Sequence, residues 1–551
     1  MGIPYYFYSL TQKYNTIISN TKPVSLDLYC IDFNGIIHNV AQDIIKKYNG
    51  TDKAKHNNDI IEQEIIEGVW ERIKYYIENY KASQYIICAD GVAPLAKMFQ
   101  QRKRRYLNIY KNTLDKVDIT WDTNAITPGT LFMEKLNTYI RRNINDDRNK
   151  NKIIYSGSDE CGEGEHKIFK KIKDMPKDDK IIIHGLDADL IILSLISHKE
   201  NIYLMREVKD PHTNDTVFNY LNIKELRKAI LCELKRNWDF AFENTGDEDS
   251  ESISVSSVSN VSSARGECDE NDLIETYCTA CTILGNDFIP HLLTVELKNN
   301  GIDTLLSATK RSIKTNGLLV NKGQINHNCL IDIFKDLANT EDEDIHRVCE
   351  RYIKKRPPDN KNMHSVHSVQ NAPSDYYGLK NKDPLINAIY NSPNKWRQEY
   401  YRVIFDNNIS IDSTVMFNAC NNYIKGIYWV YSYYKGMDID CAWYYPYNYP
   451  PTIKDILNHS IANEVPVLNC DNEFVPSYIQ LLIVLPKYSV HLLSKKHQRY
   501  MLDMYAGLFH MYPAKYNIQT FLKTQLWECS PILPLINLNY ITRVLELENK
   551  Y

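Results

Sequence analysis

The strongest constraint on the fold is a pattern repeated through the first half of the chain. Short runs of β-branched and apolar residues each end in an acidic or glycine-rich turn. Stretches with helical periodicity lie between them, including 59–80 and 130–142. Strands that alternate with helices predict an α/β domain built on a largely parallel sheet. The predicted strands are SLDLYCIDFNG (25–35), SQYIICADG (83–91), KIIYSGSD (152–159) and KIIIHGLDAD (180–189).

Composition sets limits on the kind of protein. The 551 residues are enough for two or more domains. A formal net charge of −4 means that any nucleic-acid binding would need a local basic patch. Thirteen cysteines without a paired framework fit a reducing compartment.

The chain has neither a signal-peptide pattern nor a membrane-spanning apolar run, so we expect a soluble cytoplasmic protein without membrane contact. The nucleus is the alternative, because KKRPP at 354–358 resembles a short nuclear signal.

Two polar segments divide the chain. Residues 243–270 are rich in Ser and acidic residues and have little to bury, so they predict a disordered insertion. Residues 356–385 predict a polar linker. We therefore expect an α/β core made of 1–242 and 271–355, followed by a helical, aromatic-rich region, 386–551, packed on the core.

The carboxylates near the ends of the predicted strands form a candidate site. Taken singly, each pair has an ordinary explanation: Asp187 and Asp189 fit a turn before a helix, and Glu163 and Glu165 suit a helix N-terminus. In an extended segment, however, Asp187 and Asp189 would point to the same face. Ligands of such sheets bind beyond the carboxyl ends of the strands, where carboxylates gathered together need cations. The full set, from five segments, is Asp32, Asp90, Glu163, Glu165, Asp187, Asp189 and Asp287.

An all-carboxylate set selects hard ions such as Mg²⁺ or Mn²⁺ rather than zinc. Two such ions held close together suit in-line displacement at phosphorus. Seven carboxylates are more than two hydrated ions need, so some would support the direct ligands. A rival zinc site at Cys278 and Cys281 lacks a second ligand pair at zinc spacing, and we interpret these cysteines as core residues.

A basic segment, DGVAPLAKMFQQRKRRY (90–106), follows one predicted strand directly. Its proline suits the start of a helix. Four of its side chains have the spacing i, i+4, i+7, i+8 and so share one helical face: Lys97, Gln101, Arg104 and Arg105. The alternative is a solvated basic face. Because the run follows Asp90, we favour a phosphate pocket, in which Arg binds phosphate through two hydrogen bonds.

These motifs resemble, in order, those of the XRN-type 5′→3′ exoribonucleases. The resemblance rests on MGIPYYFYSL, IDFNGIIHN, ADGVAPLAKMFQQRKRRY, ITPGTLFM, SGSDECGEGEHKI, GLDADLIILSL and LGNDFIPHL. It continues through GIYWVYSYYKGMDIDCAWYYPYNYPPTIKDI (426–456), QLLIVLP (480–486) and WECSPILPLI (527–536). The family resemblance implies that the α/β core, 1–242 and 271–355, is a PIN/FEN-like nuclease core. It also implies that 386–551 is the second conserved region, which closes over the active site.

The resemblance also implies roles for individual residues. The seven carboxylates fall on the family's metal-site positions, which implies two Mg²⁺ ions, with Mn²⁺ able to substitute. Lys97, Gln101, Arg104 and Arg105 fall on its pocket for a 5′-monophosphate, and His38 on a residue that stacks on bases. Three positions outside this set differ from the family or take another role. Cys441 stands where members often carry Trp, so we assign base stacking to Trp443, with a core position as the alternative. Asn448 replaces a His of the same motif. Asp159 is expected to have a structural role in its turn.

The expected function is processive 5′→3′ hydrolysis of single-stranded RNA with a 5′-monophosphate, releasing nucleoside 5′-monophosphates by a two-metal-ion mechanism. The chain also stops after the second conserved region, so we expect a minimal, monomeric nuclease. Whether a decapping or 5′-end-processing partner supplies its substrates is left open by the sequence. Two alternatives remain open: a flap-type 5′ nuclease acting on DNA, and a catalytically silent RNA-binding scaffold.

Overall fold

The structure is a computed structural model of the chain. It describes residues 5–48, 58–116, 120–185, 187–209, 216–235, 269–354, 383–410, 412–471 and 473–548. The predicted insertion, 243–270, lies outside the described residues except for its last two. The predicted linker, 356–385, lies outside them up to residue 382. Its end is corrected by the structure, because helix α14 (Pro384–Asn391) begins inside it.

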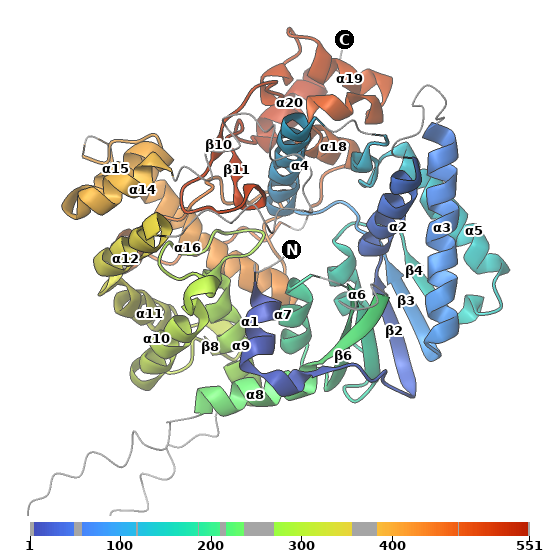
Figure 1. Cartoon of the computed structure of the whole chain (residues 1–551), viewed down its shortest axis with the longest axis horizontal. Coiled ribbons are helices and arrows are strands. Elements are labelled where there is room, and N and C mark those ends of the chain that lie inside the picture. Colours follow the sequence, from blue (N-terminus) through green and yellow to red (C-terminus); the bar gives the residue numbers. More distant parts are fainter. Residues whose placement is uncertain are drawn as a thin grey trace, which may run out of the picture.

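A seven-stranded sheet forms the centre of the first half (Figure 1). Five neighbouring strands, in the order β4-β3-β2-β5-β6, are parallel, while β7 is antiparallel to both β6 and β1. The mostly parallel sheet is therefore confirmed, and so are the four predicted strands. The strands are β1 (Ile18–Ser19), β2 (Leu26–Asp32), β3 (Ala82–Cys88), β4 (Ile153–Ser156), β5 (Lys180–His184), β6 (Asn201–Lys209) and β7 (Thr216–Asn222).

Helices cover both faces of this sheet, which explains why its strands are apolar without a break. Successive residues of β2 face opposite sides: Tyr29 and Ile31 pack with one helical layer, and Leu28 and Cys30 with the other. The first layer is α2 (Phe33–Tyr48), α3 (Asn58–Asn79) and α5 (Leu131–Asp146). The second layer includes α6 (Gly164–Ile172), α7 (Asp189–Ile196), α8 (Ile223–Lys235) and α9 (Glu270–Cys281). Helices α3 and α5 match the two helical segments predicted from periodicity.

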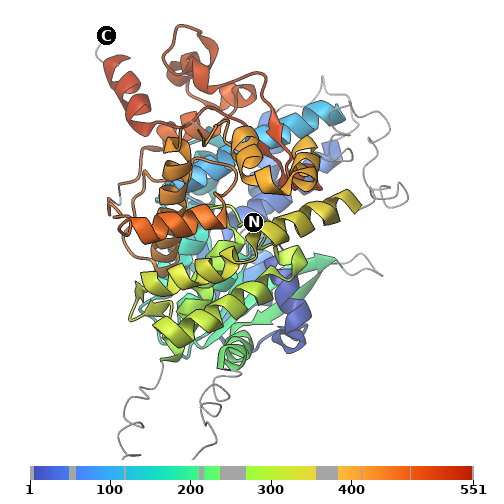
Figure 2. The same ribbon diagram turned by 90° about the vertical axis from the view of Figure 1, so that its left-hand side faces the viewer.

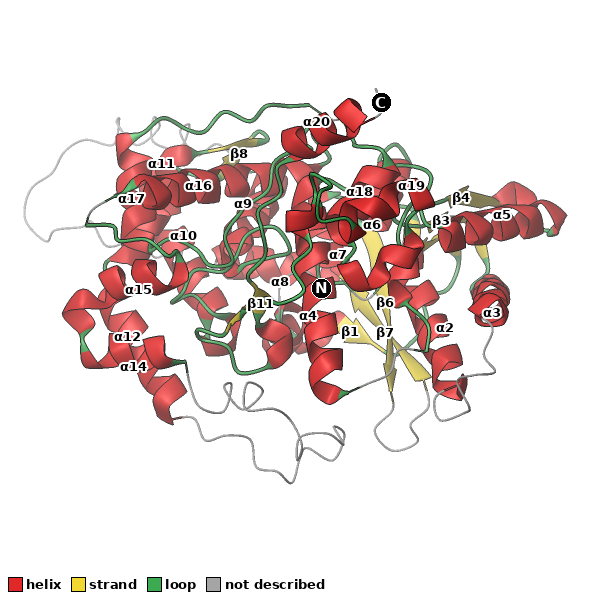
Figure 3. Ribbon diagram, turned by 90° about the horizontal axis from the view of Figure 1, so that it is seen from above, coloured by secondary structure: helices red, strands yellow, loops and turns green. Residues whose placement is uncertain are grey.

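The rest of the described chain is mainly helical, as expected. Helices α10 to α17 lie to one side of the sheet (Figure 3), whereas α18 packs on α4 (Leu95–Asp115). Helices α10 and α11 pack against each other (Figure 2). Two small antiparallel strand pairs interrupt the helices: β8 (Val320–Asn321) with β9 (Gln324–Ile325), and β10 (Ile518–Gln519) with β11 (Ser530–Pro531). The helices are α10 (Gly301–Asn316), α11 (His327–Ala338), α12 (Glu341–Lys354), α14, α15 (Trp396–Ile404), α16 (Thr414–Lys435), α17 (Ile453–Ala462), α18 (Ser477–Val484), α19 (Lys495–Leu502) and α20 (Leu538–Glu548).

Helix α16 joins this helical region to the α/β core, since it packs on α7 (Figure 1). A buried ionic network reinforces the contact. The Glu275 carboxylate on α9 pairs with Lys435, accepts a 2.8 Å hydrogen bond from Tyr431, and lies 2.7 Å from the His198 imidazole. Although burial opposes ionisation, these hydrogen bonds lower the pKa of Glu275 to about 2. The network therefore holds α16 in a fixed place relative to the sheet.

Two further expectations concern the core and the membrane. Cys278 and Cys281 are buried one turn apart on α9, within the apolar core, so they are core residues as predicted. Among the residues that the structure describes, no helix is both long and apolar enough to span a bilayer.

Candidate active site

A cavity of about 640 Å³ lies at the carboxyl ends of the parallel strands. Six of the seven predicted carboxylates line it, and Asp189, buried at the start of α7, does not. The four side chains of the basic helical face line the same cavity, and so does His38. The six carboxylates are Asp32, Asp90, Glu163, Glu165, Asp187 and Asp287. Acidic and basic groups from segments far apart in the sequence thus share one space.

The sheet topology explains why the carboxylates meet. Strand β2 lies between β3 and β5 in the sheet. From β2 the chain first adds β3 and β4 on one side and then returns to add β5 and β6 on the other, so the strand order reverses next to β2. Ligands of open α/β sheets bind at such a switch point. Asp32 is the last residue of β2, Asp90 follows β3, and Asp187 follows β5. Glu163 and Glu165 flank the first residue of α6, and Asp287 lies in the loop after α9.

Close backbone approach holds Asp90 in place. Its carboxylate accepts hydrogen bonds from Asn34 Nδ2 at 2.8 Å and from the Gly164 backbone N–H at 2.7 Å. A Cβ at position 164 would lie 2.7 Å from the Cys88 carbonyl oxygen and 2.9 Å from Asp32 Oδ1. Glycine is therefore required where α6 begins against the ends of β2 and β3.

We expect Gly164→Ala to lower the free energy of unfolding by about 1–3 kcal/mol, because the methyl group meets backbone and a carboxylate that cannot both move away. The matched control is Gly35→Ala in α2, where a Cβ meets nothing within 4 Å. That variant should gain stability, by up to about 1 kcal/mol, from the better helix propensity of Ala. Chemical denaturation of both variants measures the difference; equal stabilities would contradict the close approach.

Burial and neighbouring carboxylates raise the pKa of several of the gathered groups, whereas Lys97 lowers the pKa of Asp287 despite its burial. Burial, and then the neighbouring Asp90 and Asp187, raise the pKa of Asp32 well above its usual value. Burial and Asp189 do the same for the pKa of Glu165, and burial and Asp287 raise the pKa of Asp189 to about 7. Among the described residues, Glu165 Oε2 and Asp189 Oδ1 are buried without a hydrogen-bond partner. Anionic oxygens in this state are what a divalent cation satisfies.

Lys97 lies among the carboxylates, at one end of the basic face. Its ammonium group forms ion pairs with Glu163 and, at 3.0 Å, with Asp287. Although burial opposes the charge, these two carboxylates raise the pKa of Lys97. Lys97 was predicted in the phosphate pocket, whereas the structure pairs it with two predicted metal ligands. It therefore stands at the boundary between the acidic and basic halves of the cavity.

The other half of the cavity is lined by two neighbouring arginines, Arg104 and Arg105. Burial, together with the neighbouring Arg104, lowers the pKa of Arg105 to about 9, so its guanidinium remains charged at neutral pH. Arg105 donates a 2.7 Å hydrogen bond to Thr127, while its Nη1 is buried without a partner among the described residues. Gln101 lines the cavity beside them on α4 (Leu95–Asp115). This half suits an anion with several oxygens.

The His38 ring stays neutral beside the arginines. Burial, then Arg104 and Arg105, lower the pKa of His38 to about 4. A neutral imidazole does not repel this basic group, and its face can pack against a planar ligand. His38 therefore lines the cavity beside the arginines as an uncharged ring.

Trp443 does not line the cavity. It is 5% exposed, lies in the main hydrophobic core and packs on Trp429 with ring centroids 5.1 Å apart. The structure therefore favours the alternative, a core position, over base stacking. Asp159 also lies outside the cavity, where its carboxylate receives two hydrogen bonds from Arg141 at 2.8 and 2.9 Å; this is the structural role expected of it.

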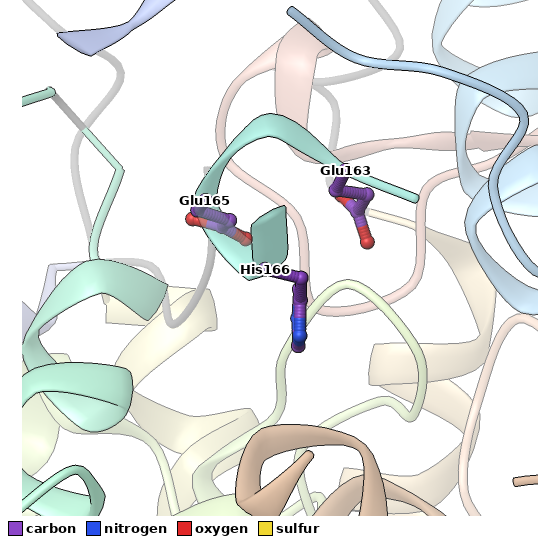
Figure 4. Close-up of side chains that lie close together, drawn as sticks. All are labelled: Glu163, Glu165 and His166. Atoms are coloured by element: carbon purple, nitrogen blue, oxygen red, sulfur yellow. The ribbon is translucent and has the colours of Figure 1, made fainter. Parts of the chain in front are cut away.

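Asn34, His166 and Tyr433 were not predicted from the sequence, yet each lies against the acidic half. Asn34 binds Asp90 and stands two residues after Asp32 in the IDFNG motif, so its position was a usable signal. His166 follows Glu165, and its ligand atoms lie within 4.8 Å of those of Glu163 and Glu165 around the first turn of α6 (Figure 4). Tyr433 reaches Glu163 from α16, a contact between distant segments that no local pattern reveals.

The described donor set fits hard divalent ions. The six predicted carboxylates that line the cavity and the buried Asp189 supply only oxygen ligands, which Mg²⁺ and Mn²⁺ prefer. His166, a nitrogen ligand next to Glu165, has its ring against Tyr433, at a centroid distance of 3.8 Å. The unpartnered oxygens of Glu165 and Asp189 provide positions for such ions.

Comparison with known proteins agrees with this arrangement. Residues 1–208 match the model described as "XRN 5′-3′ exonuclease N-terminus". Residues 267–387 and 392–550 match the model described as "Xrn1 helical domain". The chain belongs to the XRN family. Residues 271–355, which the sequence analysis assigned to the nuclease core, fall within the match to the helical domain.

Curated XRN relatives align with nearly the whole chain at low identity. The 5′-3′ exoribonuclease 1 of Homo sapiens is 24% identical over 631 residues, covering 100% of this chain and 34% of that protein. The 5′-3′ exoribonuclease 1 of Saccharomyces cerevisiae is 24% identical and covers 98% and 42%. The 5′-3′ exoribonuclease 2 homolog of Drosophila melanogaster is 24% identical and covers 98% and 70%. The chain thus spans between a third and a half of the two exoribonuclease 1 relatives.

Proposed function

We propose that this XRN-family chain is a divalent-metal-dependent 5′→3′ exoribonuclease acting on single-stranded RNA with a 5′-monophosphate. The observation that carries the proposal is the division of one cavity into two halves. Carboxylates that raise the pKa of their neighbour Asp32 line one half, and two adjacent arginines line the other. The relatives named 5′-3′ exoribonuclease support the choice of RNA and of direction.

The basic half would bind the end of the substrate. Arg104 and Arg105 would bind the terminal monophosphate, with Gln101 supplying an amide hydrogen bond. Lys97, between the two halves, would contact the phosphate nearer the carboxylates. His38 offers a neutral ring on which the first bases can stack, and stacking does not depend on base identity. These contacts would place the first phosphodiester at the carboxylates.

The acidic half would carry out hydrolysis. Asp32, Asp90, Glu163, Glu165 and Asp187, with Asp189 and Asp287 beside them, would hold two divalent ions, Mg²⁺ or Mn²⁺. Bound ions of this kind lower the pKa of attacking water and neutralise charge on the leaving oxygen. Asn34 and the Gly164 backbone N–H hold Asp90 in one orientation. Each cleavage would release a nucleoside 5′-monophosphate and leave a new 5′-monophosphate, so degradation can proceed along the strand.

The test is degradation of one 3′-labelled RNA prepared with four different 5′ ends: monophosphate, triphosphate, cap and hydroxyl. We expect rapid loss of the monophosphate RNA in Mg²⁺ or Mn²⁺, little loss of the other three, and none with EDTA. A monophosphate bound between two arginines explains the preference, since a hydroxyl end lacks the anion and a cap adds bulk.

A flap-DNA substrate assayed in parallel separates the two nuclease classes. Equal rates on all four RNA ends would contradict the monophosphate pocket. Cleavage of the flap with intact RNA would contradict the exoribonuclease and favour a DNA nuclease. Complete inactivity in both Mg²⁺ and Mn²⁺ would favour a non-catalytic RNA-binding scaffold.

A further inference from the structure

A tyrosine of the helical region contacts the acidic half of the cavity directly. The Tyr433 hydroxyl, on α16, donates a 2.6 Å hydrogen bond to Glu163 Oε1. The two side chains are 7% and 3% exposed, so water does not compete for this bond. Because a phenol is protonated near neutral pH, Tyr433 is the donor and the carboxylate the acceptor.

Packing fixes the position of the Tyr433 ring. Trp429, one turn earlier on α16, stacks on it at a centroid distance of 4.9 Å and an interplanar angle of 26°. Phe288 meets it edge-on at 5.3 Å, and His166 lies against it at 3.8 Å. Phe288 directly follows Asp287 in the sequence, and His166 directly follows Glu165. The ring is therefore held by the segments that carry predicted metal ligands.

The hydrogen bond restricts what Glu163 can do. Oε1 of Glu163 is bound to Tyr433, and Oε2 is paired with Lys97. A side chain fixed in this way presents one oxygen in one direction, as a supported metal ligand does. The contact also crosses from the residues matched by the helical-domain model to those matched by the N-terminal model.

We propose that Tyr433 is a positioning residue that orients Glu163 for divalent-metal binding, so that α16 of the helical region sets the metal affinity of the nuclease region. The inference rests on the proposed metal-dependent function and adds to it the residue that links the two regions. Removing the hydroxyl leaves Glu163 Oε1 buried without its donor, free to rotate or to bind Lys97 instead. Loss of such supporting hydrogen bonds typically weakens metal binding or activity by about 10–100-fold.

The test compares Tyr433→Phe with Tyr428→Phe in the full chain. Phenylalanine keeps the ring and its packing, and Tyr428 is a matched control on the same helix, where its hydroxyl lies 2.9 Å from His327 Nδ1. Calorimetric titration with Mn²⁺, without RNA, measures metal affinity. We expect Tyr433→Phe to weaken Mn²⁺ binding about 10-fold, while Tyr428→Phe stays within about twofold of the wild type. Thermal unfolding of both variants measures any general loss of stability.

A second measurement separates positioning from packing. In the RNA assay, the Mg²⁺ concentration for half-maximal rate should rise about 10-fold in Tyr433→Phe, with an unchanged KM for RNA and a rate restored by high Mg²⁺. Wild-type Mn²⁺ affinity in Tyr433→Phe would overturn the proposal, whether or not the protein degrades RNA. Weakened Mn²⁺ binding in a chain without RNA cleavage would support the positioning role and overturn only the exoribonuclease. A wild-type chain that binds no Mn²⁺ would overturn both.

Discussion

Asp189→Asn should reduce the rate of RNA hydrolysis by at least about 1000-fold, the loss of several kcal/mol of metal-dependent stabilisation. Asp189 is buried at the first residue of α7, and its Oδ1 has no hydrogen-bond partner among the described residues. The substitution keeps the shape of the side chain but removes the charge that a divalent ion needs. Binding of RNA should persist, since the arginines of the basic half are unchanged. Single-turnover cleavage of 5′-monophosphorylated RNA and a separate RNA-binding titration measure the two quantities.

The matched control is Asp159→Asn. Asp159 lies in the SGSDECGEGEHKI motif but outside the cavity, paired with Arg141 at an exposed position. Its loss removes a surface ion pair, which is worth about 0–1 kcal/mol of stability. This variant should cleave RNA at close to the wild-type rate. If Asp189→Asn keeps more than a tenth of the wild-type rate while Asp159→Asn matches it, Asp189 is not part of the metal site.

Arg104→Ala should lower the preference for 5′-monophosphate over 5′-hydroxyl RNA by about 10–100-fold, because a charged hydrogen bond contributes about 1.5–3 kcal/mol. Arg104 lines the cavity and is exposed, so its removal leaves no buried group without a partner. Lys97 is a less selective probe, because it is also paired with Glu163 and Asp287. The ratio of kcat/KM for the two RNAs measures the preference.

Lys111→Ala is the control for the loss of one positive charge. Lys111 is exposed on the same helix, α4, and does not line the cavity. It should leave the ratio of the two rates unchanged, although general attraction for RNA falls slightly. An Arg104→Ala variant with the wild-type ratio would show that the terminal phosphate binds elsewhere.

Local patterns predicted much of the fold and most of the cavity. The apolar runs predicted strands that the structure shows as β2, β3, β4 and β5, and the helical periodicity predicted the segments that form α3 and α5. Parallel strands align their carboxyl ends, so the placement of Asp32, Asp90 and Asp187 followed from topology alone. The spacing on α4 likewise placed Gln101 and Arg104 on one face.

The remaining features depend on contacts between distant segments. Nothing near Tyr433 in the sequence indicates that its hydroxyl binds Glu163, 270 residues away. Lys97 shares its helical face with the phosphate-pocket residues, yet the carboxylates of α6 and of the Asp287 loop determine its partners. Trp443 was predicted to stack on bases because of its place in a family motif. In the structure it packs against Trp429 and Gly426 within the core. Periodicity reports which face of a helix is buried, and it does not report against which segment.

The most direct test of the account is the first product released from 5′-³²P-labelled single-stranded RNA. If one cavity holds both the terminal phosphate and the scissile bond, the label should leave as a nucleoside 5′-monophosphate from the earliest time points, in Mg²⁺ and not in EDTA. Thin-layer chromatography beside a sequencing gel identifies the product. Labelled oligonucleotides of two or more residues as the first product would contradict the account, because the bound 5′ end would then not determine where the chain is cut.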